Sequence, residues 1–182
     1  MSDPFILRCG KYKGTSLEEV ALGKGCPGGK SEGYYYFNQL ATGEAKYFGW
    51  FWNSMSARRR WNEVHTRLNN FVSAKNCVTC GQVPATVISV AGSGRYGYSV
   101  GSCYVACDKE DCQRSLTRMP SCGTMLLPIG FDTILQFGWS AGDRKYDEKK
   151  ITKLMLELAG WTQGRMTAQN ATDFIDSRTL KA

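Results

Sequence analysis

The chain has 182 residues, a formal net charge of +7 and 42% hydrophobic residues. This length fits one ordinary domain or two small ones, with enough apolar residues for a packed core. No apolar run approaches the roughly 20 residues that span a bilayer, and MSDPFILRCG lacks the basic-then-apolar order of a signal peptide. We therefore expect a globular cytoplasmic protein with no membrane partner, and the positive charge favours an anionic one.

The positive charge is concentrated in the first part of the chain. Residues 1–76 contain eleven Lys and Arg against six Asp and Glu, a net charge of +5, whereas residues 77–122 and 123–182 each have a net charge of +1. We expect these three ranges to be a basic, aromatic-rich N-terminal α/β module, a central metal-binding unit and a helical C-terminal cap.

The first block predicts a short strand at Phe5–Leu7, a basic turn at Gly10–Gly14, and a helix capped by Thr15 or Ser16. The GKYKG turn followed by TSLEEV resembles a module found at the C-terminus of some DNA exonucleases, in which an aromatic-rich helix follows. The order of strand, basic turn and helix can place a phosphate at the helix N-terminus. The candidate contacts are Lys11, Tyr12 and Lys13. The alternative is that the tyrosine is a core residue and the lysines are solvated.

The glycine-rich loop Gly23–Ser31 does not form a phosphate-binding loop of an NTPase. Counting back from GKS places Lys24 where the motif needs its first glycine. We interpret the segment as a flexible loop in which Lys30 contacts a nucleic-acid backbone.

A basic amphipathic helix is predicted after the aromatic run YFGWFW. Its apolar positions recur at helical spacing from Trp61 to Val72. Bases stack on rings while guanidinium groups pair with phosphates, so rings interleaved with arginines suit single-stranded nucleic acid, although tryptophans are more often core residues. The candidate contacts here are Arg58, Arg59, Arg60 and Arg67. The only histidine, His65, is interpreted as a boundary residue on this helix.

Two cysteine pairs, Cys77/Cys80 and Cys107/Cys112, bracket the central unit. Each short loop with two cysteines, a knuckle, can present two thiolates to one tetrahedral Zn²⁺ ion. Disulfides would need an oxidising compartment, so we expect metal ligation. Cys103 and Cys122 are the alternative ligands in the second knuckle.

The segment between the knuckles predicts a β-hairpin, because it is rich in β-branched residues over Pro84–Ala91 and turns at Gly92–Gly94. Knuckle, hairpin and knuckle together make a zinc ribbon. This pattern resembles the zinc ribbons appended to type I DNA topoisomerases, which bind single-stranded DNA and perform no chemistry. The candidate contacts in this unit are Arg95, Tyr96, Tyr98 and Arg114.

The C-terminal part predicts a core segment over residues 124–139 and then two helices. The first begins at Asp143–Asp147 and stops at Gly160, and the second lies within Arg165–Ser177.

The sequence as a whole predicts an α+β, zinc-dependent nucleic-acid-binding protein without catalysis of its own. We expect DNA rather than RNA, and a role as a small subunit among other proteins. The alternatives are a phage-type inhibitor or CRISPR-like effector subunit that checks the DNA next to a target, and a nuclease or nucleotide-dependent enzyme. Carboxylates suited to holding a hard cation do not stand out in the sequence.

Overall fold

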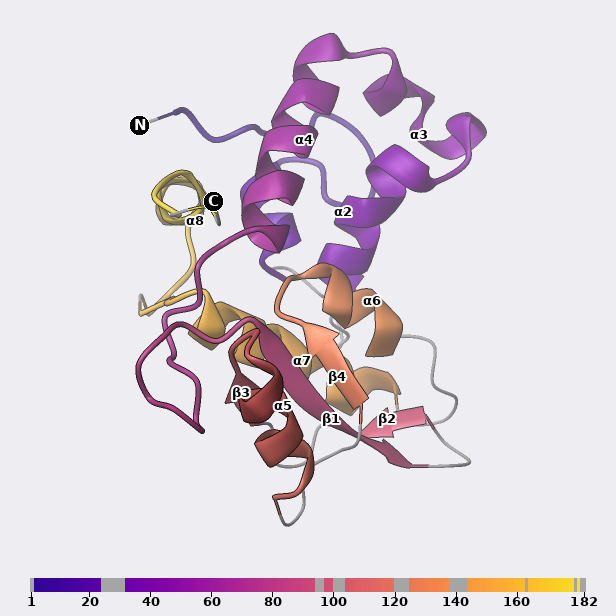
Figure 1. The fold of residues 1–182 in the computed structure, drawn as a ribbon. Coiled ribbons are helices and arrows are strands. Elements are labelled where there is room, and N and C mark those ends of the chain that lie inside the picture. The colour runs from indigo at the N-terminus through magenta and orange to yellow at the C-terminus, as the bar shows by residue number, and fades with distance from the viewer. Residues whose placement is uncertain are drawn as a thin grey trace.

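The computed structural model describes residues 2–23, 32–93, 97–99, 104–119, 125–137, 144–162, 164–178 and 180. Within these ranges the chain forms eight helices, α1 to α8, and four strands, β1 to β4. Figure 1 shows a helical half that contains α2, α3 and α4, and a second half built on the sheet. The α+β class predicted from the sequence is confirmed.

The N-terminal block forms the predicted turn and cap. Gly10 and Gly14 both have positive φ, at 82° and 86°, and Lys13 N donates to Gly10 O across the turn. Ser16 then caps α1 (Leu17–Ala21) through a capping box with Glu19. The predicted strand is reduced to a single antiparallel bridge between Ile6 and Ser16.

Three further helices and the last helix make up the helical half. They are α2 (Glu32–Thr42), α3 (Ala45–Trp52), α4 (Met55–Asn69) and α8 (Ala168–Asp176). Helix α8 contacts both α1 and α4. Figure 1 places the N- and C-terminal ends on this same side of the molecule. Buried aromatic side chains of the helical half, among them Tyr34, Phe37 and Phe51, belong to the main hydrophobic core.

The sheet is entirely antiparallel and is centred on β1 (Val87–Ser93). Strand β1 pairs with β2 (Gly97–Ser99), β3 (Val105–Ala106) and β4 (Met125–Pro128). The β1–β2 hairpin is the one that the sequence predicted between the two cysteine pairs. Strand β4 was not predicted: it comes from the segment expected only to be core, and four of its residues align with Val87–Val90.

The two faces of the sheet pack against different clusters, because successive side chains of a strand point to opposite faces. Ile88 and Val90 belong to the main core. That core also contains residues from α7 (Arg144–Leu158), which contacts α6 (Asp132–Phe137). Val87, which precedes Ile88 on the strand and therefore points to the opposite face, packs instead against the smaller cluster that holds the cysteines and Leu116 of α5 (Glu110–Thr117).

The predicted C-terminal helices are present. Helix α7 buries Ile151, Met155 and Leu158 on one face, as its apolar spacing predicted, and Gly160 follows it with a φ of 78°. Helix α8 buries Phe174 and Ile175. The division into three units at residues 76 and 122 stays a prediction.

Candidate metal centre

The first cysteine pair lies on a tight turn that a glycine closes. Gly81 has a φ of 69° and its amide donates to Cys77 O at 2.8 Å. A residue with a β-carbon is disfavoured at that φ, which explains the glycine directly after the second cysteine. The turn is tied to the sheet by the hydrogen bond from Val78 N to Val105 O at 3.0 Å. The local sequence CVTCG therefore specifies a knuckle in front of β3.

The second cysteine pair differs from the predicted loop. Cys107 directly follows β3, whereas Cys112 lies in the first turn of α5. The pair is therefore a strand-to-helix connection, and the four residues between the cysteines include the N-cap and the helix start. Gln113 on α5 donates from its side chain to Cys107 O at 3.2 Å, which fixes the helix against the end of the strand.

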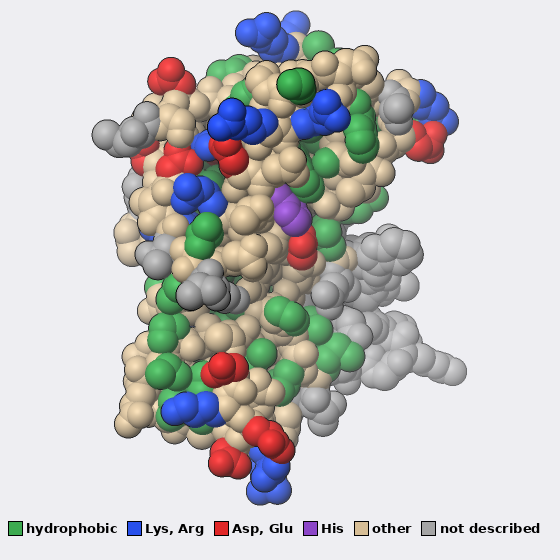
Figure 2. Space-filling model, turned by 45° about the horizontal axis from the view of Figure 1, so that its top comes forward, with side chains coloured by type: hydrophobic (Ala, Val, Ile, Leu, Met, Phe, Trp, Pro, Cys, Tyr) green, Lys and Arg blue, Asp and Glu red, His purple; other side chains and the backbone are tan. Residues whose placement is uncertain are grey.

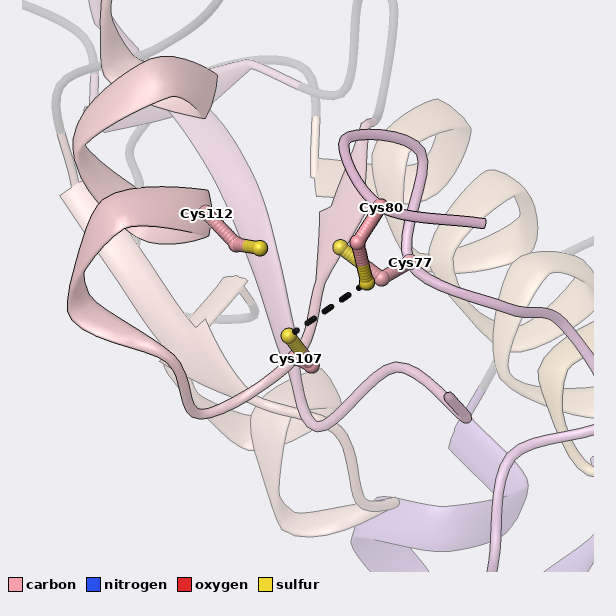
Figure 3. A group of neighbouring side chains, drawn as sticks. All are labelled: Cys77, Cys80, Cys107 and Cys112. Carbon is pink, nitrogen blue, oxygen red and sulfur yellow. Dashed lines mark hydrogen bonds between the residues drawn. The ribbon is translucent and has the colours of Figure 1, made fainter. Parts of the chain in front are cut away.

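The four sulfur atoms of the knuckle and the helix come together at one point. All four Sγ atoms lie within 4.8 Å of one another, and Cys80 Sγ is 4.0 Å from Cys107 Sγ (Figure 3). A tetrahedral Zn²⁺ ion with Zn–S bonds of about 2.3 Å separates its sulfurs by about 3.8 Å. A small contraction would bring the four thiols to that geometry, so these residues fit a four-coordinate metal ion.

The pKa values of these thiols show how neighbouring sulfurs and backbone amides affect their ionisation. Burial opposes ionisation of Cys77, but backbone amides of Cys80, Cys107 and Thr79 lower its pKa to about 6. Burial and the three neighbouring cysteines raise the pKa of Cys112 to about 12. Four adjacent thiolates therefore require a cation to offset their charge.

The centre is enclosed by protein. Cys77, Cys107 and Cys112 are buried, and Cys80 is intermediate. Thr79 donates from its hydroxyl to Cys112 O at 3.3 Å, which joins the knuckle to α5. Four protein sulfurs leave no coordination position for a substrate, which is the arrangement of structural rather than catalytic zinc sites. Within the described ranges, no other group of three or more Cys, His, Asp or Glu side chains is gathered this closely.

The remaining cysteines do not join this group where they are described. Cys9 is exposed on the N-terminal turn. Cys26, Cys103 and Cys122 lie outside the described residues. The possibility that Cys103 or Cys122 is a ligand in the second knuckle therefore stays a prediction.

The predicted nucleic-acid contacts of the N-terminal turn are divided between surface and core. Lys11 and Lys13 are exposed. Tyr12 is only 4% exposed, and its ring packs edge-on against Tyr36 at a centroid distance of 4.7 Å. The tyrosine is thus a core residue, as in the alternative stated for it.

The arginines of α4 are divided in the same way. Arg58 and Arg59 are exposed. Arg60 points inward: its Nε is 2.7 Å from Glu18 Oε1 and its Nη1 is 3.0 Å from Asp176 Oδ1. Arg67 donates to the backbone oxygen of Asp176 at 2.9 Å. Arg60 and Arg67 therefore hold α4 to α1 and α8.

The candidates in the glycine-rich loop and in the central unit are less fully placed. Lys30, Arg95 and Tyr96 lie outside the described residues, and Tyr98 is in β2, where only the backbone is described. Arg114 is exposed on α5 and forms ion pairs with Glu110 and, at 3.6 Å, with Asp111.

One polar cluster was not predicted. His65 on α4 lies 3.2 Å from Asp132 Oδ1, and the same oxygen accepts a hydrogen bond from Tyr34 Oη at 2.6 Å. Asn69 donates to Tyr34 Oη at 2.9 Å and accepts from the Asp132 amide at 2.8 Å. Burial and the Asp132 carboxylate raise the pKa of Tyr34 well above its usual value. Nothing local marks this cluster, because its partners come from α2, α4 and α6.

Among the described residues, no helix is long and apolar enough to cross a membrane. Comparison of the chain with protein-family models, with curated proteins and with solved structures found no match.

Proposed function

We propose that this protein is a zinc-stapled nucleic-acid-binding protein without catalysis of its own, acting as a small subunit of a DNA-handling complex. The observation that supports the metal is the convergence of Cys77, Cys80, Cys107 and Cys112 within 4.8 Å. Zinc is the expected ion because four thiolates in a tetrahedral, closed set are typical of structural zinc. Free thiols of this kind also suit a reducing compartment such as the cytoplasm.

In this proposal, metal binding supplies the stability that a small hydrophobic cluster cannot provide. The cysteine cluster contains only a few apolar residues, among them Ala106 and Leu116, and a cluster so small stabilises a hairpin and a short helix weakly. Metal binding of a structural zinc site supplies on the order of 10 kcal/mol of folding free energy. The ion would hold the knuckle, β3 and α5 together as a zinc ribbon whose second half is helical.

The charge distribution supports the nucleic-acid part of the proposal. Exposed lysines and arginines lie on the N-terminal turn and on α4, and their acidic neighbours are partly engaged inside the fold: Glu18 is fully buried against Arg60. In Figure 2 Lys and Arg side chains gather toward the upper part of the molecule, where Figure 1 places α3 and α4. Lys11, Lys13, Arg58 and Arg59 are the residues that we expect to contact the nucleic acid.

The test is metal analysis of the purified protein followed by a salt titration of binding. We expect one zinc ion per chain, and an affinity for fluorescein-labelled DNA that falls linearly on a log–log plot against salt. Arg58→Ala/Arg59→Ala should reduce the slope by at least about one, whereas Lys109→Ala/Lys153→Ala, which removes the same charge elsewhere, should change it less. A protein that contains no zinc, or that fails to bind DNA at low salt, contradicts the proposal.

A further inference from the structure

The outward face of α4 (Met55–Asn69) presents an ordered pattern of exposed polar side chains. At about 100° per residue, positions 55, 58, 59, 62 and 66 fall on one side of the helix. All of them are exposed, whereas Ala57, Val64 and Leu68 on the opposite side are buried in the main core. We call this surface the α4 outer face, and it consists of Met55, Arg58, Arg59, Asn62 and Thr66.

The α4 outer face is positively charged. Arg59 is 85% exposed, and the Arg58 side chain has no hydrogen bond or ion pair with any residue that the structure describes. The nearby carboxylate of Glu63 forms ion pairs with both Arg59, at 3.2 Å, and Arg60, at 3.3 Å. Its single negative charge is therefore shared between two positive charges. The first turn of α4 contains no acidic residue. A polyanion approaching this side therefore meets a net positive charge, to which the Arg58 side chain contributes without an acidic partner among the described residues.

The chemistry of these side chains also matches base edges. Arginine and asparagine form two-point hydrogen bonds with guanine and adenine in the major groove, and methyl groups such as those of methionine and threonine contact thymine. Helix α4 has 15 residues and is about 22 Å long, and the major groove of B-DNA, about 12 Å wide, admits a helix.

The same face argues against other occupants. It has no aromatic ring on which the bases of a single strand could stack. The rings of this helix lie off that face and are partly buried: Trp61 donates from Nε1 to Phe37 O at 2.7 Å and stacks on His65, which is 28% exposed. A protein partner would require an apolar centre, and Met55, at 75% exposure, is the only large apolar side chain there. Duplex RNA is disfavoured because its major groove is deep and narrow.

We propose that the α4 outer face enters the major groove of double-stranded DNA, with Arg58 and Asn62 contacting base edges and Arg59 at the phosphates. This inference rests on the proposed function, and it makes two parts of it specific: the form of the nucleic acid and the element that selects sequence. Arg60 takes no part, because it is held by Glu18 and Asp176.

The experiment selects bound DNA from a pool of 20-base-pair duplexes with randomised sequence, using the zinc-loaded full chain. The selected duplex, a scrambled duplex and a single strand of equal length are then compared by fluorescence anisotropy. Four variants are measured: Arg58→Ala with Lys153→Ala as its charge-matched control, and Asn62→Ala with Gln169→Ala as its control. Zinc content and melting temperature confirm that each variant is folded.

We expect enrichment of a short duplex motif that the protein binds at least tenfold more tightly than the scrambled duplex or the single strand. Arg58→Ala should weaken binding to the motif about 5- to 150-fold, the range for loss of one two-point base contact. Asn62→Ala should reduce the preference for the motif while leaving binding to the scrambled duplex within twofold, and both control variants should bind within threefold of the parent protein.

Three results overturn the inference. If the single strand binds as tightly as the duplex, or if no motif is enriched, α4 does not read a groove. If Arg58→Ala and Asn62→Ala bind the motif like their controls, another element reads it. In these cases DNA binding, and with it the proposed function, is unaffected; a parent protein that binds no DNA at low salt removes both.

Discussion

Replacement of Arg60 by methionine tests whether this arginine belongs to the fold. Arg60 is 12% exposed and Glu18 is fully buried, and the two side chains meet at 2.7 Å. Removing one partner of a buried pair leaves an uncompensated charge, which costs about 3–5 kcal/mol. Asp176, 19% exposed, loses its ion pair with Arg60 as well and keeps the hydrogen bond from Ser2. We therefore expect Arg60→Met to lower the free energy of unfolding by at least 3 kcal/mol.

The adjacent arginine provides the control. Arg59 is on the same helix and pairs with the same Glu63, but it is 85% exposed, and an exposed pair of this spacing contributes about 0.3–0.5 kcal/mol. Urea unfolding at neutral pH with saturating zinc should give Arg59→Met a stability close to that of the parent protein.

A double variant separates charge from packing. In Glu18→Gln/Arg60→Met neither side chain is charged, so the buried Glu18 carboxylate that Arg60→Met leaves without its cation is gone. The double variant should therefore be more stable than Arg60→Met alone. If Arg60→Met unfolds within 1 kcal/mol of Arg59→Met, the inward assignment of Arg60 is refuted.

Two further substitutions test the polar cluster and the basic turn. Burial opposes ionisation of Asp132, but hydrogen bonds from His65 and Tyr34 outweigh this effect and lower its pKa. The ionised carboxylate therefore stabilises the fold above its unfolded pKa of about 3.9, and this stabilisation is lost as the pH falls through the folded pKa. Asp132→Asn should thus cost about 1 kcal/mol at pH 7, and the difference from the parent protein in urea midpoints should vanish in acid; a constant difference from pH 7 to pH 2 contradicts this reasoning. At the turn, Gly10→Ala should destabilise more than Gly14→Ala: both glycines have positive φ, but only at Gly10 would a β-carbon collide with the Tyr36 hydroxyl. Equal melting temperatures for the two variants would contradict the predicted collision.

The features that the sequence predicted well are those with local causes. The knuckle follows from two cysteines and a glycine, and the hairpin from β-branched residues around a glycine turn. The cap of α1 follows from Ser16 and Glu19, three residues apart. Each of these can be identified within one short stretch of sequence, because the interactions that stabilise them act within that stretch.

The features that it missed depend on partners far along the chain. Arg60 meets Glu18 and Asp176, 42 and 116 residues away, so nothing near RRR indicated which arginine turns inward. Strand β4 is short and includes Pro128, and only pairing with β1 makes it a strand. The spacing of Cys107 and Cys112 predicted a loop, although Glu110 and Asp111 favour a helix N-terminus there.

Removal of the metal should divide the molecule along the boundary between its two hydrophobic clusters. All four cysteines of the centre belong to the smaller cluster, whereas Val64 and Leu68 of α4, with Ile88 of β1, belong to the main core. Chelation should therefore abolish hydrogen-exchange protection in the knuckle and in α5, because the metal is their main source of stability. Helix α4 should remain protected, because its buried face packs in the main core and not against the metal centre. Cys77→Ser should reproduce this pattern, and Cys9→Ser, which alters an exposed thiol on the N-terminal turn, should leave both regions protected. If chelation instead unfolds α4 together with α5, or if α5 stays protected without metal, the four sulfurs are not a separable structural centre.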